Sequence, residues 1–425
     1  MPARPVAFDL TRLITRLRHA SPTGIDRVDL AYARRYLNGE GERFGIVSTG
    51  LGPRVLDRAT ALGIVETVAA GWVEDGGAEE DPVYRRLAKL TPASPVRRGG
   101  GGGSWHRRRL QGEISLRTLR AGGVERLPAG TIYLHTSHLR LDRPGRFDWL
   151  YARPDIRPVF FVHDLIPISH PEYGREGEAR RHALRMETVA RHAAHVLVNS
   201  SDVGKRFSDY VAGRGLARPA VTVAPLGVEP AFSQREGAPP SVDRPTFLAC
   251  GTIEPRKNHL LLLHIWRALG ERLGERTPRL LLIGRRGWEI ENVVDLLDRA
   301  PAIREHVVEV TGLGTQGLAR LMRGATALLM PSFIEGYGLP VVEAAASGLP
   351  VVASDIAVHR EIAAGFGHFL DPLDGPGWAD AVVALAEPGS TLRADLARRL
   401  DGYGPPSWEA HFERADAALG ALPDS

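Results

Sequence analysis

Short apolar runs alternate with helical segments in two successive series, and this repetition constrains the fold more than any other feature of the chain. In the first series the strand-like runs are 6–10, 44–49, 131–135, 159–162, 195–199 and 221–224, with a helix expected at Gly24–Leu37. In the second series they are Thr246–Cys250, Arg279–Ile283, 306–310, Ala327–Met330 and 350–353. Alternation of this kind is typical of parallel sheets with crossover helices. We therefore predict an α/β protein with two Rossmann-like, doubly wound parallel-sheet domains.

A Pro-rich polar stretch at 229–245 separates the two series, and we place an interdomain linker there because such composition is typical of domain boundaries. The predicted domains are 1–228, with an irregular insertion at 73–128, and 246–400. Residues 401–425 contain an amphipathic helix that we expect to pack back across the interface. Ligands of open parallel sheets bind beyond the carboxyl ends of the strands, so two facing sheets predict a cleft.

Composition narrows the class further. The chain has 425 residues, 43% of them hydrophobic, and no apolar stretch approaches the roughly 18 residues needed to span a bilayer. We expect a soluble cytoplasmic protein without a signal peptide. The single cysteine, Cys250, excludes an internal disulfide and a multi-cysteine metal site, and its apolar neighbours indicate a core residue.

The net charge of +4 is built almost wholly from arginine, because Lys89, Lys205 and Lys257 are the only lysines. This balance does not call for a nucleic-acid partner. The most concentrated basic patch extends from Arg97 to Arg109 across a glycine run. Two interpretations stay open: a disordered insertion, or a peripheral contact with anionic lipid at the inner face of the plasma membrane.

Two glutamates eight positions apart form the first candidate site. Glu335 lies in a glycine-rich loop, and Glu343 is expected on the first turn of a helix that Pro340 opens and Gly348 closes. Backbone amides at the start of such a helix can donate to ligand hydroxyls or phosphate. Each acid alone has an ordinary alternative, either a solvated loop side chain or a favourable interaction with the helix dipole. Together they can hold the hydroxyls of a sugar and of a ribose.

A second candidate site follows the first strand of the second series. There Arg256 and Lys257 stand at the expected start of a helix, where cations oppose the helix dipole. The pattern therefore favours a phosphate that joins them, with an exposed solvated pair as the alternative. The chain has no Asp-x-Asp, Gly-x4-Gly-Lys-Ser/Thr or His-Glu-x2-His motif, so we predict a metal-independent reaction in which protein donors meet the charge of a leaving diphosphate.

These motifs resemble those of the family-four retaining glycosyltransferases, which have the GT-B fold. The resemblance rests on the Glu-x7-Glu segment, the segment that begins at Gly251, Pro331-Ser332, Asn199-Ser200, residues 224–228 and Ser407-Trp408-Glu409. Together these motifs span most of residues 195–410. The resemblance implies an N-terminal domain that binds the acceptor and a C-terminal domain that binds a nucleotide sugar.

For the C-terminal domain, the resemblance implies that Arg256 and Lys257 hold the donor diphosphate, and that Glu343 accepts from the ribose hydroxyls. Glu335 would hold the transferred sugar. The residues implied to assist are Gly336, Tyr337, Gly338 and Leu339 through their amides, and Gly284, Arg285 and Arg286 beside the base or phosphates. Solvated loop charges are the alternative for the two arginines.

For the N-terminal domain, the resemblance implies two further contacts. Gly24 stands in the loop whose amide approaches the phosphate, although the usual double glycine is reduced here to one. His163 matches the residue that approaches the donor sugar at the reaction centre. A buried structural histidine that caps the preceding strand is the alternative.

The resulting hypothesis is a retaining glycosyltransferase that moves a hexose to a saccharide or lipid-linked saccharide in surface-polysaccharide synthesis, without cofactor or metal. The segments 21–28 and 160–173 resemble bacterial mannosyltransferases and favour GDP-mannose over UDP-linked sugars as donor. A nucleotide-sugar epimerase of related fold and a non-catalytic nucleotide-sugar-binding partner are the alternatives. A glycoside hydrolase is disfavoured because it would leave the Arg256 and Lys257 pair without a phosphate.

Overall fold

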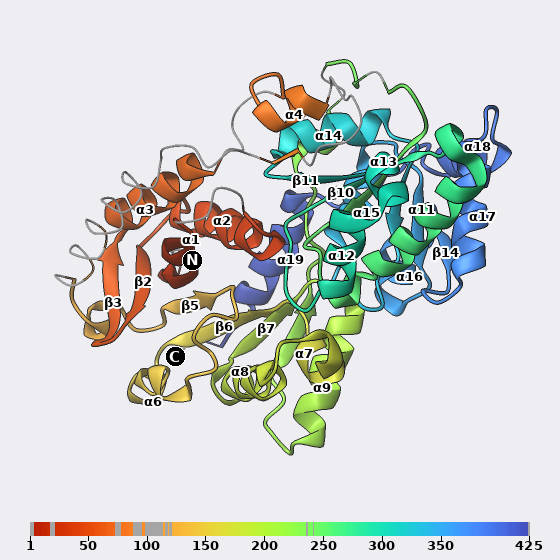
Figure 1. Cartoon of the computed structure of the whole chain (residues 1–425). Coiled ribbons are helices and arrows are strands. Elements are labelled where there is room, and N and C mark those ends of the chain that lie inside the picture. Colours follow the sequence, from red (N-terminus) through yellow and green to blue (C-terminus); the bar gives the residue numbers. More distant parts are fainter. Residues whose placement is uncertain are drawn as a thin grey trace. The chain divides into compact units, whose positions relative to one another are not determined.

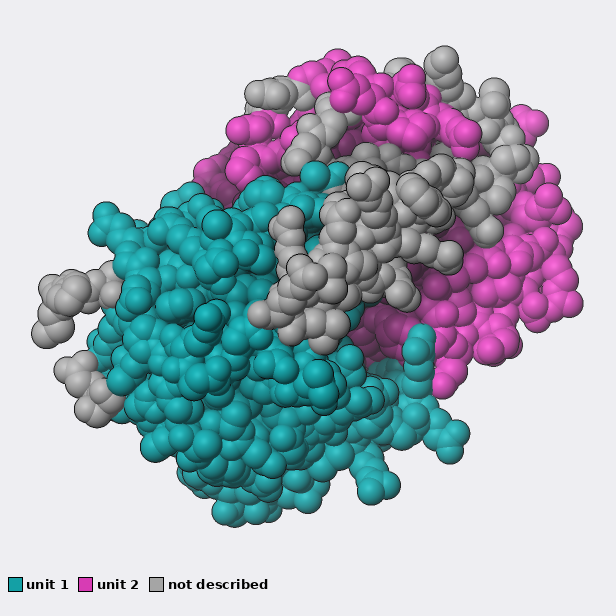
Figure 2. Space-filling view, turned by 90° about the vertical axis from the view of Figure 1, so that its left-hand side faces the viewer, with its two compact units in different colours: residues 1–75, 100–226, 409–425 teal, residues 76–99, 227–408 magenta. Residues whose placement is uncertain are grey.

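The computed structural model describes residues 4–17, 22–72, 78–87, 96–97, 114, 118, 121–234, 237–240 and 242–423. The chain divides into two compact units, shown in Figure 2. Unit 1 comprises Met1–Asp75, Gly100–Leu226 and Glu409–Ser425, and unit 2 comprises Gly76–Gly99 and Gly227–Trp408. Each unit has its own sheet and its own buried core.

Unit 1 is built on a seven-stranded sheet of order β3-β2-β1-β5-β6-β7-β8. Its strands are β1 Val6–Asp9, β2 Arg43–Thr49, β3 Gly52–Asp57, β5 Ile132–His135, β6 Arg157–Val162, β7 His195–Val198 and β8 Ala220–Val223. All neighbours are parallel except β2 and β3, which form an antiparallel hairpin at the edge. The predicted parallel strands are confirmed, whereas β3 was missed because its Gly52-Pro53 start reads as a turn.

The helices of unit 1 cover its sheet (Figure 1). They are α1 Thr11–Arg16, α2 Gly24–Leu37, α3 Arg58–Gly71, α6 Trp149–Ala152, α7 Ile166–Ser169, α8 Glu178–His192 and α9 Ser201–Gly213, with 3-10 turns η1 Val124–Arg126, η2 Pro144–Arg146 and η3 Pro171–Tyr173. The predicted helix Gly24–Leu37 has the expected bounds. It starts with a capping box, in which Thr23 and Asp26 each accept from the other's backbone amide.

The C-terminal helix α19 (Trp408–Gly420) packs on α2 of unit 1 from Glu409 onward. His411 lies with its Nδ1 3.0 Å from the carbonyl of Pro225 and its Nε2 2.8 Å from the Tyr32 hydroxyl. A carbonyl only accepts, so Nδ1 donates and Nε2 accepts from the tyrosine. Burial lowers the pKa of His411 to about 4, which keeps the ring neutral as this arrangement needs.

Unit 2 is built on a second seven-stranded sheet, parallel throughout, of order β14-β13-β12-β9-β10-β11-β4. Its strands are β4 Val96–Arg97, β9 Thr246–Cys250, β10 Arg279–Ile283, β11 Val307–Thr311, β12 Ala327–Met330, β13 Val351–Ser354 and β14 His368–Leu370. The strands β9, β10, β12 and β13 are buried along their whole length, which explains why they are apolar apart from the terminal residues Thr246, Arg279 and Ser354.

The helices of unit 2 lie on both faces of this sheet, with Trp266 and Trp378 fully buried in the core. They are α4 Pro82–Leu87, α10 Pro230–Ser233, α11 His259–Leu273, α12 Glu291–Arg299, α13 Pro301–His306, α14 Thr315–Gly324, α15 Leu339–Ala346, α16 Ala357–Ala363, α17 Gly375–Ala386 and α18 Thr391–Arg399, with 3-10 turns η4 Pro255–Lys257 and η5 Gly274–Arg276. Among the helices of the described residues, none is long and apolar enough to cross a membrane.

Part of the predicted insertion 73–128 belongs to unit 2, so the boundary predicted at 228 does not separate the units by itself. The strand β4 adds to the edge of the second sheet beside β11, with Val96 opposite Val310. We call residues 78–87 and 96–97 the docked segment. The rest of the patch from Arg97 to Arg109, and with it the predicted membrane contact, lies outside the described residues apart from the Arg97 backbone.

Asp81 holds the docked segment against the rest of unit 2. Its Oδ1 accepts from the Val83 amide in the first turn of α4 at 2.8 Å, and its Oδ2 accepts from the Gly314 amide at the N-cap of α14 at 2.7 Å. One buried carboxylate therefore serves the start of two helices. Arg320 of α14 adds an ion pair to Glu79 and lies over the Tyr84 ring.

We predict that Asp81→Ala destabilises unit 2 by about 2 to 4 kcal/mol, because it removes the acceptor from two helix starts and leaves buried amides unpaired. Urea unfolding followed by tryptophan fluorescence measures this loss, since Trp266 and Trp378 report on unit 2. The control is Glu79→Ala in the same segment, which removes an exposed partner and is expected to leave the unfolding midpoint nearly unchanged. Equal midpoints for both variants would contradict the anchoring role of Asp81.

Candidate functional site

Four charged side chains meet in unit 2 where the loops after β9 and β12 adjoin. Glu335 accepts from Lys257 Nζ at 2.5 Å and from Arg256 at 2.7 Å, and Ser332 Oγ donates to the same carboxylate at 2.7 Å. Arg256 also lies 2.6 Å from the carboxylate of Glu254. We call Glu254, Arg256, Lys257 and Glu335 the ion cluster.

Local backbone geometry brings the ion cluster together. Gly251 ends β9 with φ 131°, and Asn258 has a left-handed φ of 54° between η4 and α11. The Asn258 side chain holds that conformation by donating to the Pro372 carbonyl at 2.8 Å. The two loops are joined directly, because the Phe333 amide donates to the Arg256 carbonyl at 2.9 Å.

The cluster is buried and electrically balanced, with two cations against two carboxylates. Glu335 is 6% exposed and Lys257 is 7% exposed. Burial alone would raise the pKa of Glu335, but the adjacent Arg256 and Lys257 hold it well below the ordinary range. Burial lowers the pKa of Lys257, and Glu335 opposes that change. The short contacts therefore join an ionised glutamate to two cations.

This pairing corrects one step of the sequence argument. The cations were expected at a helix start, where an external anion would be needed to offset the dipole. In the structure they lie in the 3-10 turn η4, before α11 begins, and Glu335 and Glu254 supply the anions. The sequence hid this because Glu335 is 78 positions away from Lys257.

The second glutamate lies deeper in its helix than predicted. The helix α15 begins at Leu339 with Gly338 as its N-cap at φ 98°, and its first turn contains no acidic residue. Glu343 is therefore in the second turn, where it is buried. Burial and the nearby Glu343 raise the pKa of Cys250, which is buried and free as expected. Tyr337, in the loop before α15, is also buried, and burial raises the pKa of its hydroxyl.

His359 is a residue of this region that the sequence reasoning missed. It lies on α16 with Nδ1 2.9 Å from the Ser354 carbonyl, so Nδ1 donates and Nε2 keeps its lone pair. Its ring edge packs against Gly338, where an added Cβ would be 3.7 Å from Nε2. Nε2 is buried without a hydrogen-bond partner among the described residues. The available signal was its position just after β13, at the carboxyl end of a parallel strand.

The three residues after β10 have separate roles. Gly284 is required by space, because a Cβ there would lie 1.8 Å from the Gly251 carbonyl oxygen. Arg285 is exposed. Arg286 is held by Asp298 at 2.5 Å and by Glu309 at 2.8 Å, and the hydrogen bonds that it donates to Asp298 raise its pKa. Arg286 therefore fastens this loop to α12 and β11.

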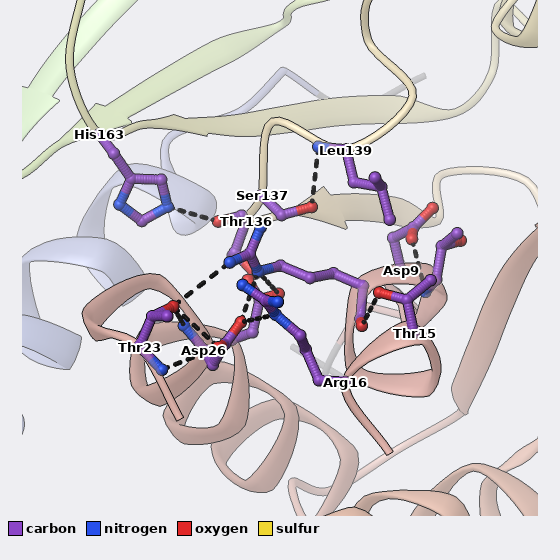
Figure 3. Close-up of polar contacts among 12 residues, drawn as sticks. Asp9, Thr15, Arg16, Thr23, Asp26, Thr136, Ser137, Leu139 and His163 are labelled. Carbon is purple, nitrogen blue, oxygen red and sulfur yellow. Dashed lines mark hydrogen bonds and ion pairs between the residues drawn. The ribbon is translucent and has the colours of Figure 1, made fainter. Parts of the chain in front are cut away.

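In unit 1, Gly24 is the first residue of α2, and His163 directly follows β6. His163 is buried, and its Nε2 lies 2.7 Å from the Thr136 carbonyl. Figure 3 shows the ring pointing toward Thr136, with Thr23 and Asp26 of the α2 start nearby. Burial lowers the pKa of His163 to about 4. The ring is thus neutral at physiological pH.

The described residues contain no group of three or more His, Cys, Asp or Glu side chains placed to hold a metal ion. The residues predicted to bind donor divide between the units. Unit 2 contains Arg256, Lys257, Gly284, Arg285, Glu335, Gly336, Tyr337, Gly338, Leu339 and Glu343, and unit 1 contains Gly24 and His163.

Comparison with known proteins identifies the class of the fold. HepE from Anabaena, solved in complex with UDP-glucose, superposes with a TM-score of 0.62 over 98% of this chain and 100% of that one, at 13% sequence identity. The chain has the GT-B fold, as predicted, with two parallel-sheet α/β domains.

One family model matches the second domain. Residues 244–387 match the family model described as glycosyl transferases group 1, and this part of the chain is a domain of that family. Serotype-specific mannosyltransferase WbdA of Escherichia coli is 29% identical over 218 residues, which are 48% of this chain and 26% of that protein. O-antigen chain mannosyltransferase B of Escherichia coli is 34% identical over 163 residues, 38% of this chain and 42% of that protein. The matches thus cover less than half the length of these relatives.

We predict that Glu335→Gln destabilises the protein by about 3 to 5 kcal/mol at pH 7, because it leaves the buried Lys257 ammonium and the partly buried Arg256 beside a neutral amide. The folded-state pKa of Glu335 is depressed, so its contribution is fully present above the ordinary glutamate pKa and is lost as the pH falls below it. The gap between wild type and variant should stay constant from pH 8 to 5 and narrow below about 4.5.

Urea unfolding at a series of pH values measures this gap. The matched control is Asp209→Asn, which neutralises one member of the exposed Lys205–Asp209 pair and should have little effect at any pH. A gap for Glu335→Gln that widens on acidification would show that the carboxylate is not ionised in the folded protein.

Proposed function

We propose that this protein is a retaining glycosyltransferase that transfers a hexose from a nucleotide sugar to a saccharide or lipid-linked saccharide acceptor. The best candidate donor is GDP-mannose. The observation that carries the proposal is the buried ion cluster at the carboxyl ends of β9 and β12, within a domain of the glycosyl transferases group 1 family. Ligands of parallel α/β sheets bind at this edge.

The charges of the ion cluster suit a diphosphate that arrives with its own sugar. A balanced cluster has no surplus cation, so additional donors must meet the phosphate charge. Arg285 is exposed in the adjoining loop, and the Arg285 carbonyl accepts from the Ile253 amide at 2.9 Å beside the ion cluster. Arg256, Lys257, Arg285 and the loop amides before α15 would hold the diphosphate without a metal ion.

The two glutamates of the proposed donor site have different roles. Glu335 accepts three hydrogen bonds from protein, and a carboxylate has room for about four, so a single sugar hydroxyl can be added. Glu343, in the second turn of α15, would accept from the ribose. Both residues position the donor, and neither is placed as a nucleophile in this proposal.

The proposed reaction proceeds with retention of anomeric configuration. The bond between the anomeric carbon and the phosphate oxygen breaks while an acceptor hydroxyl bonds to that carbon from the same face, and its proton passes to the departing phosphate. The neutral His163 would contact the donor sugar, and the Gly24 amide would approach the phosphate.

The donor assignment rests on the relatives. Two of them are mannosyltransferases, which supports a mannosyl donor, whereas HepE binds UDP-glucose and defines the main competitor. The deciding experiment is a thermal-shift panel of GDP-mannose, GDP, UDP-glucose, UDP-N-acetylglucosamine and UDP, all in EDTA. Stabilisation by GDP-mannose above GDP supports the proposal, and stabilisation by the UDP compounds alone would reassign the nucleotide.

Turnover of the stabilising donor is then followed in EDTA with mannose-containing oligosaccharides, and the product linkage is read by NMR. An α-configured product from an α-configured donor supports retention. Activity lost in EDTA and restored by Mg²⁺ or Mn²⁺ would contradict metal independence. A new sugar nucleotide formed without acceptor would identify an epimerase, and binding without turnover would identify a non-catalytic partner.

We predict that Lys257→Ala lowers kcat/KM for transfer by more than about tenfold, because one charge-assisted contact of about 1.5 to 3 kcal/mol is lost from the diphosphate and from Glu335. The chain offers a matched control in Lys205→Ala, whose side chain is 75% exposed in a surface ion pair. Steady-state kinetics of the two variants compare a buried and an exposed lysine. Wild-type kinetics for Lys257→Ala would remove this residue from the donor site.

A further inference from the structure

The His163 residue is held on several sides by side chains and backbone of unit 1. Its backbone amide donates to His138 Nε2 at 3.2 Å, and its carbonyl accepts from Asn199 Nδ2 at 3.1 Å. Its ring is fixed by the contact of Nε2 with the Thr136 carbonyl at 2.7 Å. A carbonyl only accepts, so Nε2 carries the proton and Nδ1 of the neutral ring is the acceptor.

The Thr136 residue is itself anchored. It follows β5 directly and is buried, and its hydroxyl donates to Asp29 Oδ1 of α2 at 2.7 Å. A hydrogen-bonded path therefore runs from α2 through the Thr136 side chain and carbonyl to the His163 ring. The hydroxyl and the carbonyl belong to one residue, so a shift of the hydroxyl moves the acceptor that selects the histidine tautomer.

The burial of the Asp29 carboxyl costs free energy. It is 1% exposed, and its Oδ2 has no hydrogen-bond partner among the described residues, with Arg12 Nε 3.7 Å away. Arg12 gives its short contact of 2.7 Å to Asp26 instead. Burial raises the pKa of Asp29 to about 7, so the carboxyl lowers the stability of the fold at neutral pH. A need for tight packing therefore does not explain why an aspartate stands at this position.

We propose that Asp29 and Thr136 are positioning residues for His163: the carboxyl of Asp29 fixes Thr136, and the Thr136 carbonyl fixes the ring orientation and the Nε2–H tautomer. The ring then presents its Nδ1 lone pair as an acceptor. The consequence for catalysis rests on the proposed function, in which His163 contacts the donor sugar. The effect on the tautomer does not depend on it.

The test compares Thr136→Val, which keeps the side-chain shape without the hydroxyl, with Thr136→Ser, which restores the hydroxyl. Asp29→Ala removes the other end of the same hydrogen bond. The matched control is Thr188→Val, which deletes another buried hydroxyl of unit 1, one that donates to the Leu141 and Leu184 carbonyls. Melting temperatures identify any variant that does not fold.

Two measurements are made on each folded variant. Ring 15N shifts of histidine-labelled protein report the tautomer of His163, which is assigned by the loss of its signal in His163→Gln. Steady-state transfer with GDP-mannose gives kcat and the donor KM. We expect Thr136→Val and Asp29→Ala to mix the two tautomers and to lower kcat about tenfold or more, with the donor KM changed less than about threefold.

Thr136→Ser and Thr188→Val should keep the Nε2–H tautomer and wild-type kcat. The double variant of Asp29 and Thr136 should lose no more than either single variant, because both act through one hydrogen bond. An unchanged tautomer in Thr136→Val and Asp29→Ala would overturn the proposal, and so would a changed tautomer with unchanged kcat. If wild type transfers no sugar from any donor, the proposed function fails, and the ring shifts still decide whether Asp29 and Thr136 fix the histidine.

Discussion

The arrangement of the loops and strands around the candidate site in unit 2 depends on one buried, ionised carboxylate, that of Glu335. A charge that is 6% exposed must be paired, and Arg256 and Lys257 pair it at 2.7 and 2.5 Å. The pairing requires the loops after β9 and β12 to adjoin, which in turn requires these two strands to be neighbours in the sheet. A strand order that separated them would leave the buried Lys257 and Glu335 without each other, while Arg256 would keep Glu254 of its own loop. The pairing of the charges therefore depends on the order of the strands in the sheet.

Unit 1 has a comparable arrangement of polar groups around the neutral His163 ring. The strand ends of β5 and β6 bring Thr136 and His163 together, and α2 supplies Asp29 from the covering layer. In both units the polar groups stand just beyond the carboxyl ends of parallel strands, where the ladder of backbone bonds stops and side chains take over. The apolar strands fix positions, and the residues that follow them form the polar clusters.

Sequence patterns were sufficient for most of the strands, whereas β3, β4 and β14 were missed. Runs such as Thr246–Cys250 and Ala327–Met330 were predicted with their observed bounds, because a strand buried on both faces must be apolar throughout. The sequence could not predict which side chains far apart along the chain form ion pairs or hydrogen bonds. The sequence did not indicate that Glu254 pairs with Arg256 or that Ser332 donates to Glu335, and His359 was overlooked, since none of them differs in type from an ordinary loop or helix residue. The depth of Glu343 in α15 was missed because a helix start is uncertain by a residue or two in any pattern.

The docked segment makes both units discontinuous in sequence, and this affects how such a chain can be recombined. Consider a hybrid that joins the first 228 residues of this protein to the second domain of a relative. Its β4 and Asp81 would come from this protein, although they pack on the second domain. The relative's sheet would then pair with an edge strand from this protein. In the reciprocal hybrid, which contains this protein's second domain, the Gly314 amide would lose its acceptor Asp81. Exchange of second domains at the linker is thus not neutral for this protein. The transferable module is the whole of unit 2, including the docked segment, which the chain encodes between two stretches of unit 1.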